Sequence, residues 1–409
     1  MIFRNIRFAF RQLINNKVFS LINILGLSIA LLASIAILKH VAFQHSFDDF
    51  HENSQSIYRL SVSYTDIAGS YGEYAGVSNA IGPKLTQEQP QILRSTSIFP
   101  LTEGFRHTIV STVLESGPKE HSIDNIWSVN VDVFDMFSFG EMRGNAEGFS
   151  SAISSIAISE SIATQFFGIE DPIGKEMKLN GNLSFIISSV FEDWPANSHL
   201  HPEILVQSDY LNEVGNVKPN MHFVGGSSYT YLQLMSGTSM DEMDTHLAEF
   251  VNKNKRAQDY DDVSLHLMPL ADIHLNAYEQ RKDMAEVNNG DTLSLLVLLS
   301  FLILLIAWFN YINLVTSSTL QKSKEIGIRR IHGAKPYTLF VQRLFDSIIT
   351  VFLATLVALT ANQFLKPYFS EVIGQGTLLD LVNSNSLIYY FLLFLGLCIT
   401  VSAAARVSR

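Results

Sequence analysis

The stretch LSLLVLLSFLILLIAWFNYINLVTSSTLQ, residues 293–321, contains no charged side chain. A helix needs about 20 predominantly apolar residues to cross the ~30 Å hydrocarbon layer of a membrane, and this stretch exceeds that length. Residues 18–38 and 387–405 are also free of charge, and residues 344–365 contain only Asp346, near their start. Buried helices of soluble proteins are rarely so long and so uncharged. The sequence therefore predicts a membrane protein with four transmembrane α-helices.

Charge placement predicts the orientation of these helices. Residues 1–17 carry four Lys or Arg and no acid, residues 321–343 carry six against one Glu, and the tail adds Arg406 and Arg409. Cytoplasmic segments of membrane proteins hold the excess of Lys and Arg. Residues 40–291, in contrast, hold 35 Asp and Glu against 14 Lys and Arg, a net charge of −21, whereas the whole chain has −11. We therefore place both termini and the loop before the third span in the cytoplasm, and the acidic segment outside.

The acidic segment is expected to fold as a large α+β domain between the first and second spans, built from two subdomains. Cys398, in the fourth apolar run, is the single cysteine, so this domain has no disulfide. About 250 residues suffice to fold on a hydrophobic core without one. Apolar alternation and turn residues predict strands over residues 58–64, 126–131, 155–159, 177–179, 183–191, 229–234 and 265–269. The expected helices are residues 80–88, 160–167 and 240–254.

The first apolar run has an alternative interpretation as a cleaved signal peptide, because it follows a basic segment and contains small residues at 33–36. Its apolar stretch, however, is longer than the 7–15 residues of a signal-peptide core, and it continues past those small residues. We interpret it as a retained membrane anchor. Before it, apolar residues at helical spacing alternate with three arginines, which predicts a basic amphipathic helix on the inner membrane surface.

The sequence contains no motif that indicates an enzyme. It has no G-x-x-x-x-G-K-[ST] loop for nucleotide phosphates, no H-E-x-x-H, no G-x-S-x-G and no cysteine cluster. His199 and His201, in NSHLHPE, are the best metal candidates, but a zinc site needs three or four ligands and no third is evident nearby. We interpret the two histidines as part of a solvated turn. No catalytic, metal-binding or cofactor-binding residue, no cofactor and no nucleic-acid partner is expected.

Two pairs of polar residues lie in or near the apolar runs. Asn310 and Asn313 are in the second span, where polar side chains usually face another helix and hydrogen-bond across it. Arg343 and Asp346 are three residues apart near the cytoplasmic end of the third span. Ionisable residues in a membrane are candidates for function, and a local ion pair near the headgroups is an equally good interpretation of this pair.

The basic loop KSKEIGIRRIHGAKP, residues 322–336, is the most informative segment. Glu325 and Arg329 form an i, i+4 pair of the favoured polarity. Gly333 is placed to end a short helix, and Pro336 suits the first turn of the next one. Such a helix would carry an apolar side made of Ile326, Ile328 and Ile331, which would suit docking onto another protein. The alternative is that the segment is an ordinary cytoplasmic loop, since such loops generally carry an excess of Lys and Arg.

This loop and the span before it, residues 290–340, resemble the FtsX-like permease domain of MacB-type ABC transporters. The core KEIGIRRIHGA, residues 324–334, follows the pattern K-E-I-G-I-R-R-x-x-G-A. NNKVFSLINILGLSIA, residues 15–30, is similar to the first span of Bacteroidetes-type members of the family. VDVFDMFSF, AISESIATQFFGIEDPIGKEMKL, VFEDWPANSHL and MPLADIHL resemble the MacB-like periplasmic core domain.

The resemblance implies an arrangement of domains in a bacterial inner membrane. Residues 1–17 would be a cytoplasmic amphipathic helix, residues 18–43, 291–317, 338–365 and 386–405 the four spans, residues 44–290 the periplasmic core domain, residues 318–337 the cytoplasmic coupling segment and residues 366–385 a periplasmic loop. Residues 291–409 would form the FtsX-like permease domain.

The resemblance also implies a mechanism. Such permeases pair as dimers, or with a second permease half, and work with a separate ABC ATPase that binds ATP. The coupling segment docks on that ATPase and transmits its movements to the periplasmic domain, which can bind an adaptor or another periplasmic partner. The residues carried over for coupling are Lys324, Glu325, Ile326, Gly327, Ile328, Arg329, Arg330, Gly333 and Ala334.

The sequence departs from the family in two respects. Many Bacteroidetes-type members are about twice as long, so the chain corresponds to one half of the double-length form. Its fourth span ends without the Pro-Ala element common there. Three functions follow as hypotheses: the permease of an exporter or lipoprotein-releasing system, an FtsX-like transmitter that regulates a periplasmic partner without moving a solute, and a membrane-anchored sensor. The coupling motif argues against the sensor.

Overall fold

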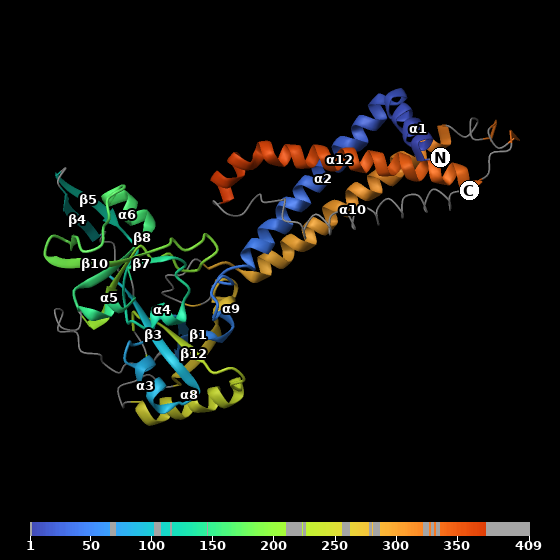
Figure 1. Cartoon of the computed structure of the whole chain (residues 1–409). Helices are drawn as coiled ribbons and strands as arrows, with labels where there is room; N and C mark the ends of the chain where they lie inside the picture. The colour runs from blue at the N-terminus through green and yellow to red at the C-terminus, as the bar shows by residue number, and fades with distance from the viewer. Residues whose placement is uncertain are drawn as a thin grey trace. The chain divides into compact units, whose positions relative to one another are not determined.

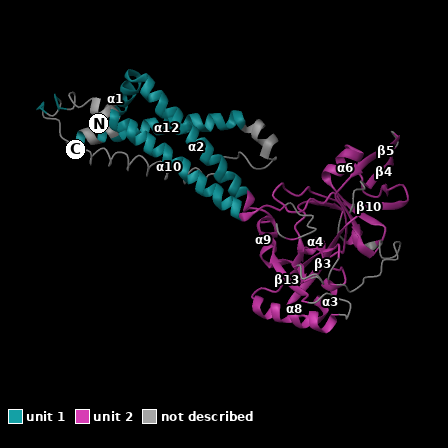
Figure 2. Cartoon of the chain, turned by 180° about the vertical axis from the view of Figure 1, so that it is seen from behind, with its two compact units in different colours: residues 1–43, 291–409 teal, residues 44–290 magenta. Residues whose placement is uncertain are grey.

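The computed structural model of the 409-residue chain divides into two compact units, residues 1–43 with 291–409, and residues 44–290 (Figures 1 and 2). We call them the membrane unit and the exported unit. The structure describes residues 2–65, 71–101, 108–114, 117–144, 146–209, 223, 226–255, 262–277, 280, 287–321, 327–328, 331–332 and 336–373.

Long apolar helices make up the membrane unit. They are α2 (Lys17–Gln44), α10 (Gly290–Gln321) and α12 (Pro336–Ile373). Among the described residues, three segments are long and apolar enough to cross a membrane, Lys17–Gln44, Gly290–Ser317 and Leu344–Leu365. The fourth expected span, residues 386–405, lies outside the described residues. Pro336 opens α12, as predicted, because its missing N–H is not needed in the first turn of a helix.

The N-terminal amphipathic helix α1 (Ile2–Asn15) packs against α12. Ala9 is buried, with 1% of its surface exposed, whereas Phe3 is 90% and Ile14 61% exposed. One side of α1 therefore contacts protein, and an apolar stripe on another side remains uncovered.

The exported unit is an α+β domain whose described strands follow one hydrogen-bonded path, β13-β1-β12-β3-β6-β11-β8-β10-β9-β4-β5. Two more strands join its flanks, since β2 pairs with β1 and β7 with β10. β3 pairs with β12 over most of its length but with β6 only at Phe99 and Pro100. The two expected subdomains are therefore two lobes that share β3. The first lobe contains β1 (Ile57–Thr65), β2 (Tyr71–Tyr74), β3 (Ile92–Pro100), β12 (Tyr229–Leu234), β13 (Ser264–Pro269), α3 (Ile81–Glu88) and α8 (Met240–Asn254).

The second lobe contains β4 (Thr108–Leu114), β5 (Gly117–Ile123), β6 (Ile126–Val129), β7 (Met142–Gly144), β8 (Ser155–Ser159), β9 (Glu176–Leu179), β10 (Leu183–Phe191) and β11 (Ile204–Gln207), with α4 (Val133–Met136), α5 (Ala146–Ser151) and α6 (Glu160–Phe167). The helix α9 (Leu270–Asn276) follows β13. The predicted strands and helices are confirmed, and β8, α6, β12 and α8 have the predicted bounds. Side-chain caps fix two of these helices: Ser159 accepts from Ile162 N at the start of α6, and Ser239 from Glu242 N at the start of α8.

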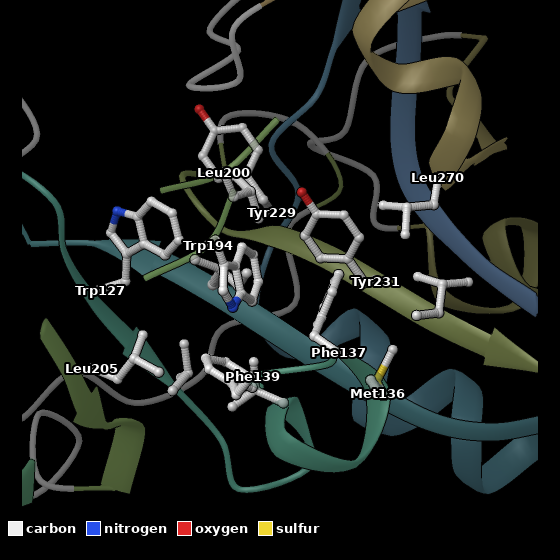
Figure 3. Packing of buried hydrophobic residues seen from close by; sticks show 14 of the residues in the cluster. Trp127, Met136, Phe137, Phe139, Trp194, Leu200, Leu205, Tyr229, Tyr231 and Leu270 are labelled. Atoms are coloured by element: carbon white, nitrogen blue, oxygen red, sulfur yellow. The ribbon is translucent and has the colours of Figure 1, made fainter. Parts of the chain in front are cut away.

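An aromatic cluster lies between the lobes and receives side chains from both (Figure 3). The short aromatic segment around α4 supplies Met136, Phe137 and Phe139, which meet Trp194 and Tyr231. Phe137 and Tyr231 are edge-to-face, with ring centroids 5.3 Å apart. The two lobes therefore share a core, and each also has a hydrophobic core of its own.

Candidate functional site

The coupling segment is described at Gly327, Ile328, Ile331 and His332. The first three are helical, and His332 N donates to Ile328 O over 3.1 Å, as expected of a short helix. Ile328 is 58% and Ile331 85% exposed, so two large apolar side chains face outward. Gly327 is half-buried, and a Cβ placed on it would meet no atom within 4 Å, so there is open space beside this glycine. The other residues predicted for coupling, Lys324, Glu325, Ile326, Arg329, Arg330, Gly333 and Ala334, lie outside the described residues.

The spans α2, α10 and α12 pack through small and polar residues within the membrane unit. Ser34 Oγ donates to Ser300 O (3.2 Å) and Ser300 Oγ donates back to Ser34 O (3.4 Å), which joins α2 to α10. Ser28 Oγ donates to Ala354 O (2.9 Å), which joins α2 to α12. Small residues and hydroxyl groups hold membrane helices together because they allow close approach and satisfy polar groups away from water. A buried apolar cluster around Tyr311 completes this contact.

Asn310 and Asn313 lie on the other side of α10 and are exposed. Trp308 and Tyr311 face α2 and α12, whereas an apolar stripe shares the side with the two asparagines. That stripe consists of Leu295, Leu299, Leu302, Ile306 and Phe309. The contact of these asparagines with another helix stays a prediction, and any such helix lies beyond α2 and α12. The side chain of Arg343 lies outside the described part of the structure, so its pairing with Asp346 stays a prediction.

A buried polar cluster lies in the exported unit, and the sequence did not predict it. His199 is 1% exposed, and its Nδ1 lies 2.8 Å from Asp48 Oδ2. His199 Nε2 and the Tyr231 hydroxyl are 2.8 Å apart, and Asp48 Oδ1 accepts from Ser198 Oγ and His199 N, both over 3.2 Å. The interpretation of His199 as part of a solvated turn is therefore wrong. A buried histidine needs such partners because an unsatisfied polar group in a core is costly.

His51 completes this cluster. Its Nδ1 accepts from Ser138 N (3.0 Å), and its Nε2 lies 3.9 Å from Asp48 Oδ1. Burial lowers the pKa of His51 to about 4, and the nearby Asp48 carboxylate opposes this shift without cancelling it. Burial alone would raise the pKa of Asp48, but the charge and hydrogen bonds of His199, with a smaller effect of His51, hold it below its usual range. No group of three or more His, Cys, Asp or Glu within the described part of the chain is placed to hold a metal ion.

The stability of the exported unit should depend on pH through His51. Its pKa is lower in the folded chain than in the unfolded chain, so the unfolded chain binds the proton more readily, and lowering the pH from 6.5 toward 4 favours unfolding. Once the pH is below the folded-state pKa of His51, this group has lowered the free energy of unfolding by about 3 kcal/mol. Urea unfolding of the detergent-solubilised chain between pH 7.5 and 4.5 measures it. His51→Gln keeps an acceptor for Ser138 N without titrating there, so its pH profile should be flatter. Parallel profiles for the two proteins would contradict this assignment.

The sequence held little signal for this cluster. Asp48 and His199 are far apart in the chain, and both lie in short polar stretches that are typical of loops. Asp48 also has a positive φ of 61°, which only the folded chain reveals. It is a conformation that Asp tolerates better than most residues.

Comparison with known protein families finds two regions of similarity. Residues 20–250 match the MacB-like periplasmic core domain, and residues 297–408 match the FtsX-like permease C-terminal region. The two regions occur in the order expected for an exported unit inserted after the first span.

Individual proteins show the same similarity. The ABC transporter permease YvrN of Bacillus subtilis is 21% identical over 377 residues, which cover 88% of this chain and 86% of that protein. The macrolide export ATP-binding/permease protein MacB of Bdellovibrio bacteriovorus is 24% identical over 57% of this chain but only 34% of its own length. The crystal structure of the periplasmic region of MacB from Actinobacillus actinomycetemcomitans aligns with a TM-score of 0.36 and 12% identity, over 53% of this chain and 90% of that chain.

Proposed function

Because the chain belongs to the MacB/FtsX-like family of ABC transporter permeases, we propose that it is the transmembrane subunit of an exporter or lipoprotein-releasing system driven by a separate ATPase. The observation that carries the proposal is the order of parts within one chain. An exported α+β unit lies between the first and second spans, and the FtsX-like region follows it. In this arrangement the spans are the physical connection between events in the cytoplasm and the exported unit.

The ATPase is proposed to dock on the coupling segment. Ile328 and Ile331 support this, because two exposed isoleucines three residues apart form an apolar patch of the kind that a partner covers. The basic residues around them suit an acidic rim on the partner.

A second permease, either another copy of this chain or a related half, is proposed to cover the exposed side of α10. Asn310 and Asn313 support this, because amide groups facing hydrocarbon lose the hydrogen bonds that water would give them. The surrounding leucines and phenylalanine suit helix packing. The fourth span is the other segment that could meet this side.

We place the chain in the inner membrane, with four spans, both termini and the coupling segment in the cytoplasm, and the exported unit in the periplasm. The distribution of charge supports this orientation, since the acidic exported unit is opposite in sign to the basic terminal and loop segments.

The proposal is tested with the ABC ATPases encoded in the same genome. Each is co-expressed with the chain, and we expect one to co-purify with it and to change its ATP hydrolysis several-fold when both are reconstituted in liposomes. The chain alone should hydrolyse no ATP above background. Robust hydrolysis by a preparation free of any ATPase, or binding to none of the encoded ATPases, would contradict the proposal.

The alternative function is an FtsX-like transmitter that regulates a periplasmic partner, and the match to the FtsX-like C-terminal region favours keeping it. The two functions differ in what ATP drives. Release of lipid-anchored proteins or solutes from the reconstituted vesicles indicates export. Activation of an added periplasmic hydrolase without such release indicates transmission.

A further inference from the structure

The helix α9 connects the core of the exported unit to the chain segments that enter the membrane unit. Leu270, Ile273 and Ala277 are fully buried in the aromatic cluster, where Figure 3 shows Leu270 beside Tyr231. They recur at helical spacing, so this side of α9 is fixed to the core. His274 lies on a neighbouring side of the helix and is 4% exposed.

His274 contacts both connections to the membrane unit. Its Nε2 donates to Oε1 of Gln44, the last residue of α2, because an amide oxygen can only accept. Asn288, two residues before α10, donates from Nδ2 to the same oxygen over 3.2 Å. Asn288 N also donates to the carbonyl of His274 over 2.6 Å.

The setting makes these hydrogen bonds strong constraints. Gln44 is 9% exposed, and Phe47 stacks on the His274 ring with centroids 3.4 Å apart and planes 5° from parallel. Water therefore has little access to replace a broken hydrogen bond, so losing one of these bonds is costly. A single amide oxygen thus joins the chain leaving α2, the chain entering α10 and the helix fixed to the core.

We propose that Gln44, His274 and Asn288 form a clamp that holds the end of α2 and the start of α10 at a fixed separation. The chain leaving α2 and the chain entering α10 are then held together against α9. The reciprocal Ser34–Ser300 contact joins the same two helices within the membrane unit. His274 is a positioning residue in this scheme, and its role in transmission rests on the proposed function.

The clamp is tested by measuring the separation of the two helices in the full chain in lipid nanodiscs. Cys398→Ser removes the native thiol, and spin labels are attached through Ala42→Cys in α2 and Thr292→Cys in α10, both exposed. We expect one narrow distance distribution. His274→Phe keeps a ring against Phe47 but removes the donor, so the distribution should broaden at least about twofold. His274→Gln restores a donor and should keep it narrow.

Two controls separate the clamp from general unfolding. The first is a second label pair, at the exposed residues Glu160 and Asp244 of the exported unit, whose distance distribution should stay the same in every variant. The second is His45→Ala: His45 is exposed and adjacent to Gln44, so its replacement should change the distribution of neither label pair. Gln44→Met removes the shared acceptor from the other side and should broaden the first pair as His274→Phe does.

An unchanged first pair in either His274→Phe or Gln44→Met overturns the clamp, and so does broadening of both pairs in both variants. No ATPase is present in this measurement. A failed clamp therefore leaves the proposed function standing, and failure to find an ATPase leaves the clamp standing.

Discussion

Replacement of Asp48 by alanine is expected to destabilise the exported unit by about 3–5 kcal/mol, because it removes the acceptor of several buried hydrogen bonds and each buried donor left without a partner costs about 1–3 kcal/mol. Asp48 and His199 side chains are fully buried, and the carboxylate also accepts from Ser198 Oγ and His199 N. Alanine would leave these donors without an acceptor. It would also occupy a backbone position with φ of 61°, which alanine adopts less readily than aspartate. A loss of this size is a large fraction of the free energy of unfolding of an ordinary domain, about 5–15 kcal/mol.

Tryptophan fluorescence during urea unfolding measures this loss. In a Trp308→Phe background the remaining tryptophans, Trp127 and Trp194, both belong to the exported unit, and Trp194 lies beside His51 with ring centroids 4.9 Å apart. Asp48→Asn keeps an acceptor and tolerates the positive φ, so it should lose less, about 1–3 kcal/mol. Asp49→Ala, at the exposed next position, should change stability by less than about 0.5 kcal/mol. If Asp48→Ala and Asp49→Ala lower the free energy of unfolding equally, the buried contacts of Asp48 contribute no more to stability than an exposed residue does.

Much of the fold was predictable because its signals are local. Span length and charge bias depend on composition, and the bounds of α6 and α8 follow from capping serines that directly precede them. β12, with every residue buried, is a short stretch of strand-favouring Tyr, Thr and Leu residues between turn residues. β5 was not predicted, because its sequence GPKEHSI is mostly polar and carries no clear alternation.

The contacts that join distant parts of the chain were not predictable from the sequence. Gln44 ends an apolar helix, and nothing near it indicates that residue 274 lies opposite. The outward position of Asn310 and Asn313 was equally hidden, because α10 is apolar on all sides and its pattern does not select the side that packs. The coupling segment is the reverse case. The sequence identified it through a family resemblance, whereas its exposed isoleucines are a structural observation.

Those isoleucines lead to the second large expected effect, complete loss of coupling to the ATPase when Ile328 and Ile331 are both replaced by aspartate. Burying an isoleucine side chain in an interface stabilises it by about 1.5–3 kcal/mol. Losing two such contacts lowers affinity by about a hundredfold or more. The introduced carboxylates would also have to be desolvated without a partner. The ATP hydrolysis of the mixture should therefore fall to that of the ATPase alone, and co-purification should be lost.

Insertion and folding should survive this double substitution, because both side chains are exposed and neither belongs to a span. Ile169→Asp is the matched control, since the same change at a fully exposed isoleucine of the exported unit should affect neither ATPase binding nor hydrolysis. Ile328→Leu with Ile331→Leu preserves volume and apolar character, so most of the coupling should remain. If the double aspartate variant still co-purifies with the ATPase and alters its hydrolysis as the parent chain does, residues 322–336 are an ordinary basic loop. The docking surface would then have to be sought elsewhere on the cytoplasmic side.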